Sequence, residues 1–170
     1  MALYSEFSFE GAVIAGNTVD GCAHGISVCN FNEGGRIATV HGNIIRNILP
    51  KRPIGTAPDD DGGVGIAIEA DAAVIGNVVE NAPNFGIVAG WGRYLRDVVI
   101  TGNVLRNATI GIGVTVVPGA GTALIDNNLI SGSARAAIVG LDHARPVTGD
   151  LGRDDKSRFA QIVLGTNVVR

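Results

Sequence analysis

One short segment of the chain combines aromatic and basic side chains in a way that suits carbohydrate recognition. Trp91, Arg93 and Tyr94 fall within four residues, and Trp91 is the single tryptophan of the sequence. Broad apolar rings with polar edges can stack on sugar rings, and cationic side chains such as Lys51, Arg52 and Arg93 can pair with the carboxylate of a uronic acid. The alternative is that Trp91 packs over its own loop and that the arginines are solvated.

Three other side chains are candidates for general acid–base chemistry. Glu69 carries a carboxyl group, and His41 and His143 carry imidazoles, the type of side chain whose charge changes nearest to neutral pH. Proton transfer in catalysis uses such groups when they are held beside a substrate. The alternative for each of the three is an ordinary surface residue, so the sequence leaves open whether the protein is an enzyme.

Asp59, Asp60 and Asp61 are the candidates for a metal site, because consecutive acidic residues can suggest calcium. Hard cations need several oxygen atoms that converge on one point, whereas three consecutive side chains point in different directions. We therefore predict no metal site. We also predict no cofactor, because no P-loop, dinucleotide-binding fingerprint or HExxH motif occurs, and no GxSxG nucleophile motif is present either.

Charge and hydropathy argue against two classes of partner. The chain has 13 Lys and Arg against 16 Asp and Glu, a net charge of −3, and no basic cluster of the kind that marks a nucleic-acid surface. No run of 18 apolar residues suggests a membrane-spanning helix. The first residues lack the basic and apolar regions of a signal peptide. We expect neither a nucleic-acid nor a membrane partner.

The elements that must position these residues are short β-strands. The sequence has 20 Val and 18 Ile against 9 Leu, which favours a pleated sheet over helices. Glycine is abundant, with 25 residues in 170, as in a chain with many turns. The composition therefore predicts an all-β protein.

A repeat of about 25 residues organises these strands. Its anchor is a Gly-Asn dipeptide or a close equivalent, with the asparagine at Asn17, Asn43, Asn77, Asn103, Asn128 and Asn167. An aliphatic residue stands three positions before each anchor and another two positions after it. An asparagine at a bend tolerates a left-handed backbone, and its amide can bond to its copy in the next repeat. A second column of asparagines, four residues after three of the anchors, predicts a second ladder at Asn47, Asn81 and Asn107.

Each repeat then closes on a Gly-Ile pair followed by alternating residues, at 25–28, 65–68, 86–89 and 111–114, with a partial copy at 137–140. A unit of three short strands cannot bury its apolar face alone, but a stack of such units can. We predict one domain over residues 1–170, a single-stranded parallel β-helix of about six rungs of about 25 residues, with three short strands per rung. Insertions are expected at about 49–63 and 142–158.

The VxIxGN and GI rungs resemble right-handed parallel β-helix proteins of the pectate-lyase-like superfamily, from Phe9 to Arg170. The segments FEGAVIAGN (9–17), NFNEGGR (30–36), GIAIEAD (65–71), GWGRYLRDV (90–98) and VVPGAG (116–121) are similar to the C-terminal part of twin-arginine-exported bacterial repeat proteins. That family has no established activity, so the resemblance implies a right-handed fold and export but no catalytic residues. Its members carry a signal and more rungs. We therefore expect this chain, which shows no signal, to be a fragment of a longer solenoid, periplasmic or secreted if the whole protein bears one.

The sheet made by the Gly-Ile strands is the predicted binding face. Strict alternation places these residues outward: Ser27, Cys29, Ala67, Glu69, Val88, Gly90, Gly113, Thr115, Val139 and Leu141. We predict a groove floored by Ala67, Glu69 and Val88. The insertion 49–63 should form one wall, and the segment with Trp91, Arg93 and Tyr94 the other.

Two functions follow from these features. The first is an exported module that binds or processes an acidic polysaccharide in this groove. The catalytic signatures of polygalacturonases, pectin esterases and pectate lyases are missing from the sequence. The alternative is a non-catalytic structural or interaction solenoid. Neither end shows a capping helix, so we also expect self-association through uncapped ends near Phe9 and near Val168 and Val169.

Overall fold

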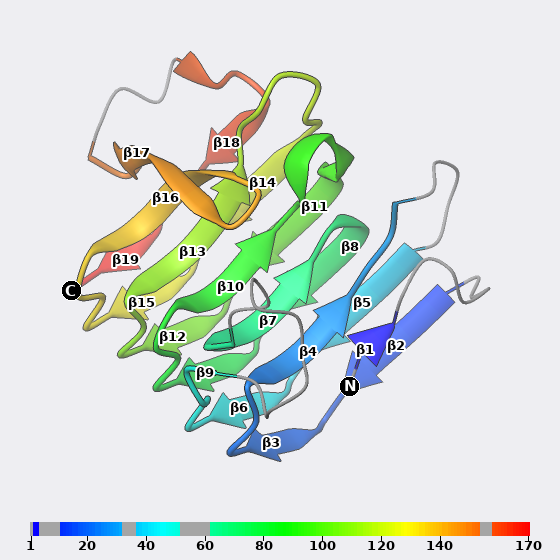
Figure 1. The fold of residues 1–170 in the computed structure, drawn as a ribbon, viewed down its shortest axis with the longest axis vertical. Helices are drawn as coiled ribbons and strands as arrows, with labels where there is room; N and C mark the ends of the chain where they lie inside the picture. Colours follow the sequence, from blue (N-terminus) through cyan, green and yellow to red (C-terminus); the bar gives the residue numbers. More distant parts are fainter. Residues whose placement is uncertain (1, 4–10, 32–36, 52–61, 154–157) are drawn as a thin grey trace.

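The computed structural model describes residues 2–3, 11–31, 37–51, 62–153 and 158–170. The chain winds as a three-sided parallel β-helix, as the repeat predicts, and the rungs follow one another along the stack from the N-terminus to the C-terminus (Figure 1). Each complete rung contributes one strand to each of three sheets, which we call sheets A, B and C. The β-branched residues suit this arrangement because each strand is only a few residues long and packs on its copies.

Sheet B carries the strands that lead to each anchor: β2 (Gly11–Ala15), β5 (Ile37–His41), β8 (Ala70–Ile75), β11 (Arg96–Thr101), β14 (Ala123–Asp126) and β18 (Ile162–Leu164). Sheet C follows each anchor: β3 (Thr18–Asp20), β6 (Ile44–Arg46), β9 (Val78–Glu80), β12 (Val104–Arg106), β15 (Leu129–Ser131) and β19 (Val168–Val169). All neighbours in these two sheets are parallel.

Sheet A holds the Gly-Ile strands: β1 (Ala2–Leu3), β4 (His24–Val28), β7 (Val64–Ile68), β10 (Phe85–Ala89), β13 (Ile110–Thr115), β16 (Ala136–Asp142) and β17 (Arg145–Asp150). One turn of 3₁₀ helix, η1 (Gly92–Tyr94), follows β10. In the described part of the chain, no helix has the length and apolar character to cross a membrane.

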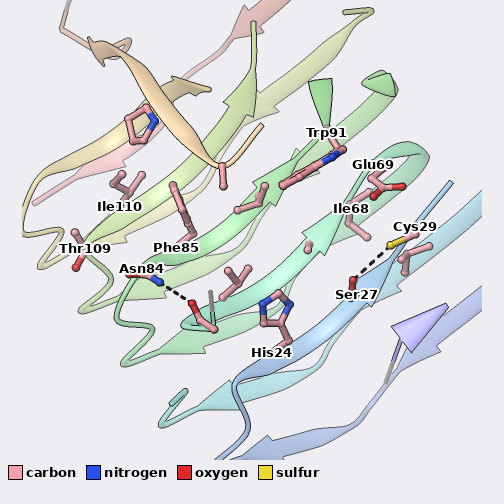
Figure 2. A pocket seen from close by; sticks show the side chains of 18 of the residues that line it. His24, Ser27, Cys29, Ile68, Glu69, Asn84, Phe85, Trp91, Thr109 and Ile110 are labelled. Carbon is pink, nitrogen blue, oxygen red and sulfur yellow. Dashed lines mark hydrogen bonds between the residues drawn. The ribbon is translucent and has the colours of Figure 1, made fainter. Parts of the chain in front are cut away.

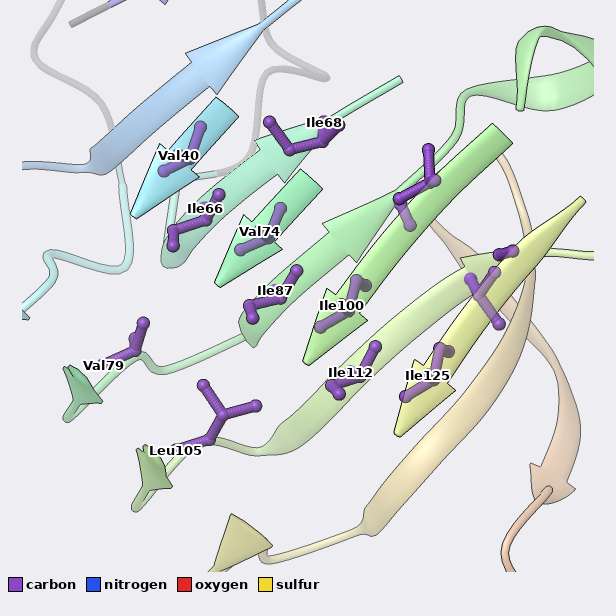
Figure 3. Close-up of a cluster of buried hydrophobic side chains, with 14 of the residues drawn as sticks. Val40, Ile66, Ile68, Val74, Val79, Ile87, Ile100, Leu105, Ile112 and Ile125 are labelled. Atoms are coloured by element: carbon purple, nitrogen blue, oxygen red, sulfur yellow. The ribbon is translucent and has the colours of Figure 1, made fainter. Parts of the chain in front are cut away.

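The core consists of columns of aliphatic side chains, each lying on its equivalent in the next rung (Figure 3). The predicted anchor column in sheet B, with Val40, Val74, Ile100 and Ile125, is fully buried. The strand pairing places Val40 beside Val74, Val74 beside Ile100 and Ile100 beside Ile125. The hydrophobic pattern therefore predicts the register correctly.

A ladder of asparagines runs beside this core. In Asn77, the backbone N–H and the side-chain Nδ2 both donate to Oδ1 of Asn103, at 2.9 and 3.0 Å. The same double contact repeats at each step along the anchor column, Asn17, Asn43, Asn77, Asn103, Asn128 and Asn167. The four middle residues are buried, so the ladder satisfies polar groups that have no access to water.

The left-handed backbone at the bends lies at the residue before the anchor, which is a glycine in the first four copies. At the first five anchors the residue before the asparagine has a positive φ, for example 63° at Gly76 and 56° at Asn127, which explains the glycine in most copies. The anchor asparagine instead directs its amide between the rungs. The second column does adopt positive φ, at Asn47, Asn81 and Asn107, and their exposed amides form the expected second ladder.

The insertion 142–158 is not simply a loop, because it contains strand β17. This strand pairs antiparallel with β16 and takes the place of the next parallel strand of sheet A. Leu151 follows it and is buried in the main core, with its N–H donating to the carbonyl of Ile138. Sheets B and C end on β18 and β19, where Val163 and Val168 are exposed.

The register can be tested with a buried charge. We expect Ile100→Asp to lower the free energy of unfolding by at least about 4 kcal/mol, because an unpaired carboxylate would lie in the middle of a dry column. Val13→Asp, at an outward-facing aliphatic residue of sheet B that is 72% exposed, is the matched control and should change stability little. Urea unfolding followed by circular dichroism measures both, and an equal effect of the two variants would contradict the register.

The anchor ladder makes a second prediction. Asn77→Ala removes the acceptor of two Asn43 donors in a buried position, so we expect a loss of about 3 kcal/mol. Asn81→Gly removes a step of the exposed ladder but keeps a residue that tolerates positive φ, and should cost less than about 1 kcal/mol. Similar losses in the two variants would show that burial of the ladder does not matter.

Candidate functional site

A groove of about 470 Å³ lies on the outer face of sheet A (Figure 2). Its floor crosses β4, β7 and β10 to the start of β13, and the side chains that line it come mainly from these strands. They include Ala67, Glu69 and Val88, together with His24, Ser27, Cys29, Val64, Phe85, Trp91, Thr109, Ile110 and Arg135. The groove therefore occupies the face on which the alternation of the Gly-Ile strands places it.

A column of glycines determines which residues face this groove. A Cβ atom at Gly86 would point toward the core, 2.6 Å from the carbonyl oxygen of Gly111, and Gly25, Gly65 and Gly111 show similar close approaches. Because the glycine and the isoleucine after it both face inward, strict alternation fails at this point. The residue before each glycine faces outward instead, so Phe85 lies on the floor of the groove.

The residues before the glycines are those that the sequence reasoning missed. His24, Val64, Phe85 and Ile110 occupy equivalent positions in neighbouring strands and all line the groove (Figure 2). The signal was present in the sequence, because each precedes an aligned Gly-Ile pair. Strict inward–outward alternation along the strand does not reveal that these residues face outward.

The outer face of sheet A closes at its C-terminal side. Val139 and Leu141, which strict alternation placed on an open surface, are 1% and 0% exposed and belong to an outer apolar cluster with Phe85, Val88 and Ile110. A Cβ atom at residue 113 would lie 2.6 Å from Leu141, so Leu141 covers that glycine. Thr115, at the end of β13, is also 0% exposed, so the prediction of an open binding face is wrong over β16 and at the end of β13.

Trp91 stands at the ends of the strands, where the chain leaves β10. It is 41% exposed, and its ring lies nearly perpendicular to that of His143, with ring centroids 5.1 Å apart. The imidazole Nδ1 lies 2.8 Å from Oδ1 of Asp142. The hydrogen bonds from His143 and then from Arg145 hold the pKa of Asp142 below its ordinary value. The β16–β17 turn thereby fixes one side of the tryptophan ring.

Glu69 lies at the same end of the groove, on a network of polar side chains at the corner between sheets A and B. Its Oε2 accepts a hydrogen bond from the backbone N–H of Asn30. The side chain of Asn30 donates to Asp71, which also accepts from Nε of Arg96 at 2.9 Å. This partly buried network holds the carboxylate in place beside the groove.

Arg135 and Thr109 lie at the opposite end, where the strands of sheet A begin. The backbone N–H of Arg135 donates to the carbonyl of Thr109, and the Thr109 hydroxyl donates to the carbonyl of Pro83. Asn84 donates from Nδ2 to the carbonyl of Gly62 at 2.6 Å. The exposed guanidinium of Arg135 is the cation that the described residues contribute to the lining.

The other basic and aromatic candidates lie outside the described lining. Tyr94 packs on Phe31, with ring centroids 4.6 Å apart, and Arg93 lies 5.5 Å over the Tyr94 ring. Lys51 is exposed and lies in a single-residue β-bridge. Arg52 falls outside the described residues.

The acid–base candidates come from different parts of the fold. His41 lies at the end of β5 in sheet B, on a different face from Glu69, whereas His143 stands beside Trp91. Asp59, Asp60 and Asp61 fall outside the described residues. Among the residues that the structure describes, no three His, Cys, Asp or Glu side chains gather as ligands for a metal ion.

The role of the corner glycines can be tested directly. We expect Gly86→Ala to destabilise the fold by about 2 kcal/mol, because the new methyl group would overlap the Gly111 carbonyl. Gly11→Ala is the matched control, since its Cβ would meet the nearest carbonyl at an ordinary 3.6 Å. Thermal unfolding measures both, and an unchanged Gly86→Ala protein would refute the close approach.

Comparison with known proteins gives one match. Searches of curated proteins and of solved structures find no significant similarity. A protein-family model described as "Protein of unknown function (DUF1565)" matches residues 5–148, which is most of the chain and includes the rungs that form the groove. The chain therefore belongs to this family.

Proposed function

We propose that the protein is a carbohydrate-binding module whose groove on sheet A holds a short stretch of an acidic polysaccharide. The observation that carries this proposal is the arrangement of the groove, with an exposed tryptophan at one end, an exposed arginine at the other and an apolar floor between them. A five-residue strand such as β10 spans about 16 Å. The groove therefore has the length for an extended ligand of several rings rather than a single sugar.

Trp91 supplies the stacking surface. Its ring is presented at a strand end and supported from one side by His143, so little conformational freedom is lost when a sugar ring packs on it. Glu69 lies at the same end of the groove, and its carboxylate can accept hydrogen bonds from sugar hydroxyl groups. The apolar faces of further rings would contact Phe85, Val88 and Ile110.

The charged groups favour one orientation of the polysaccharide along the groove. Glu69 disfavours a ligand carboxylate near Trp91, whereas Arg135 favours one at the opposite end. The pairing with uronate thus falls to Arg135 rather than to Arg93, which lies over Tyr94, or to Lys51, which does not line the described groove. The resemblance to exported repeat proteins supports placing this module outside the cytoplasm.

A structural or interaction solenoid is the second candidate function. It is favoured by the two strands that end sheets B and C, because β18 and β19 present exposed valines at an edge of the described chain. In this alternative the protein would associate through its ends, and the groove would have no glycan ligand.

Calorimetric titration with an oligouronate and with the neutral oligosaccharide of the same linkage tests the proposal. Trp91→Ala should weaken binding of both ligands about fivefold, since stacking on an exposed ring contributes about 1 kcal/mol. Arg135→Gln should remove only the preference for the oligouronate. That preference should also fall with added salt, because the ion pair is exposed.

Arg93→Gln is the matched control for charge, since it removes a neighbouring arginine that does not line the described groove. An affinity that Trp91→Ala leaves unchanged, together with an oligouronate preference that Arg135→Gln leaves unchanged, would show that the ligand sits elsewhere. Absence of binding by any acidic or neutral oligosaccharide would leave the structural solenoid as the better function.

A further inference from the structure

The outer face of sheet B carries an apolar stripe that crosses all six of its strands. The strand register aligns one outward column along the stack, Val13, Thr39, Ala73, Val99, Leu124 and Val163. A second column lies two residues further along each strand, Ala15, His41, Ile75, Thr101 and Asp126. Val13 is 72% exposed, Val163 54% and Ile75 42%, so large aliphatic groups face solvent along the stripe.

Two carboxylates border the stripe at one corner, and one of them is held in an ion pair. Asp71 and Asp97 border it at the corner toward sheet A, where positive φ values of 50° and 46° turn the backbone. Asp71 pairs with Arg96, and Asp97 accepts a hydrogen bond from Thr122. Within the two columns, His41 and Asp126 are the titratable side chains.

We propose that this stripe, on sheet B, binds a second copy of the chain to form a dimer with a two-fold axis parallel to the strands. Such an axis reverses the order of the strands between the two copies, so the first strand faces the last and the third faces the fourth. Val13 then meets Val163 of the other copy. Thr39 meets Leu124, and Ala73 meets Val99, so smaller side chains face larger ones.

The same operation sets an imidazole opposite a carboxylate. It also sets Asp97 opposite Asp71 of the other copy, where the Arg96 guanidinium paired with Asp71 offsets the second carboxylate. His41 lies on the second strand of the sheet and Asp126 on the fifth, at equivalent positions along the strand. The two-fold axis places each His41 opposite Asp126 of the other copy, twice per dimer. This donor–acceptor pairing of His41 with Asp126 favours self-recognition over contact with a general apolar surface.

The interface would be small. Six strands spaced by about 4.8 Å give a stripe about 24 Å long, which is short of the area of a standard stable interface. The dimer should therefore form reversibly as the protein concentration rises. Because the groove lies on sheet A, dimerisation through sheet B does not depend on the proposed function and leaves both grooves open.

Sedimentation equilibrium over a range of protein concentrations tests this proposal. We expect the wild-type mass to rise toward that of a dimer. His41→Asp should weaken association about tenfold, because it sets two carboxylates against each other at both contacts. The charge exchange His41→Asp with Asp126→Lys should restore association, which a merely structural role of either residue would not do.

Leu124→Asp is a second disruptive variant that adds a charge to the stripe, and Ile44→Asp on sheet C is its control, with a similarly exposed aliphatic residue. Thermal melts confirm that each variant is folded. The proposal is overturned if the wild type stays monomeric, or if the charge exchange fails to restore association. It is also overturned if Val168→Pro, at the edge of β19, abolishes association while Leu124→Asp does not, because the ends would then be the interface.

Discussion

The need to pair a buried amide at every rung is the constraint on which the rest of this structure depends. The four middle anchor asparagines are closed off from water. Their backbone N–H and Nδ2 donate to the same side-chain oxygen in the following rung, and Nδ2 also donates to a backbone carbonyl of the preceding rung, for example from Asn77 to Val40. A slip of one residue would leave these donors unpaired and would turn the aliphatic columns outward at the same time. Polar pairing and apolar packing therefore require the same register, and neither can change without the other.

A fixed register makes the outer surface periodic as well, and function can then arise where the period is broken. Over most of sheet A the outward positions are small or aliphatic and repeat from strand to strand. The departures are Trp91 after β10, the carboxylate of Glu69 after β7 and the guanidinium of Arg135 before β16. All three stand at strand ends, where side chains can vary without disturbing the columns beneath them.

The periodic part of the molecule is the part that the sequence could predict. The columns through Ile100, the two asparagine ladders and the three strands per rung follow from spacing alone, because every rung repeats the same environment. The inward orientation of both Gly86 and the isoleucine after it could not be predicted from spacing, because it depends on how closely two backbones approach. The antiparallel strand β17 did not follow either, because it occurs once and matches no repeat. Phe85 was missed as a lining residue because it precedes Gly86. Arg135 was missed because it precedes β16 and so lies outside the strand pattern.

Strand β17 affects which surfaces of the solenoid can bind a second copy. A second copy stacked on the C-terminal end in solenoid register would need to place a parallel strand where β17 already pairs with β16. That end can still offer the edges of β18 and β19, but not all three sheets together. The outer face of sheet B has no such obstacle within the described residues, since its six strands present one continuous register. A lateral contact through that face is therefore more compatible with the fold than end-to-end growth.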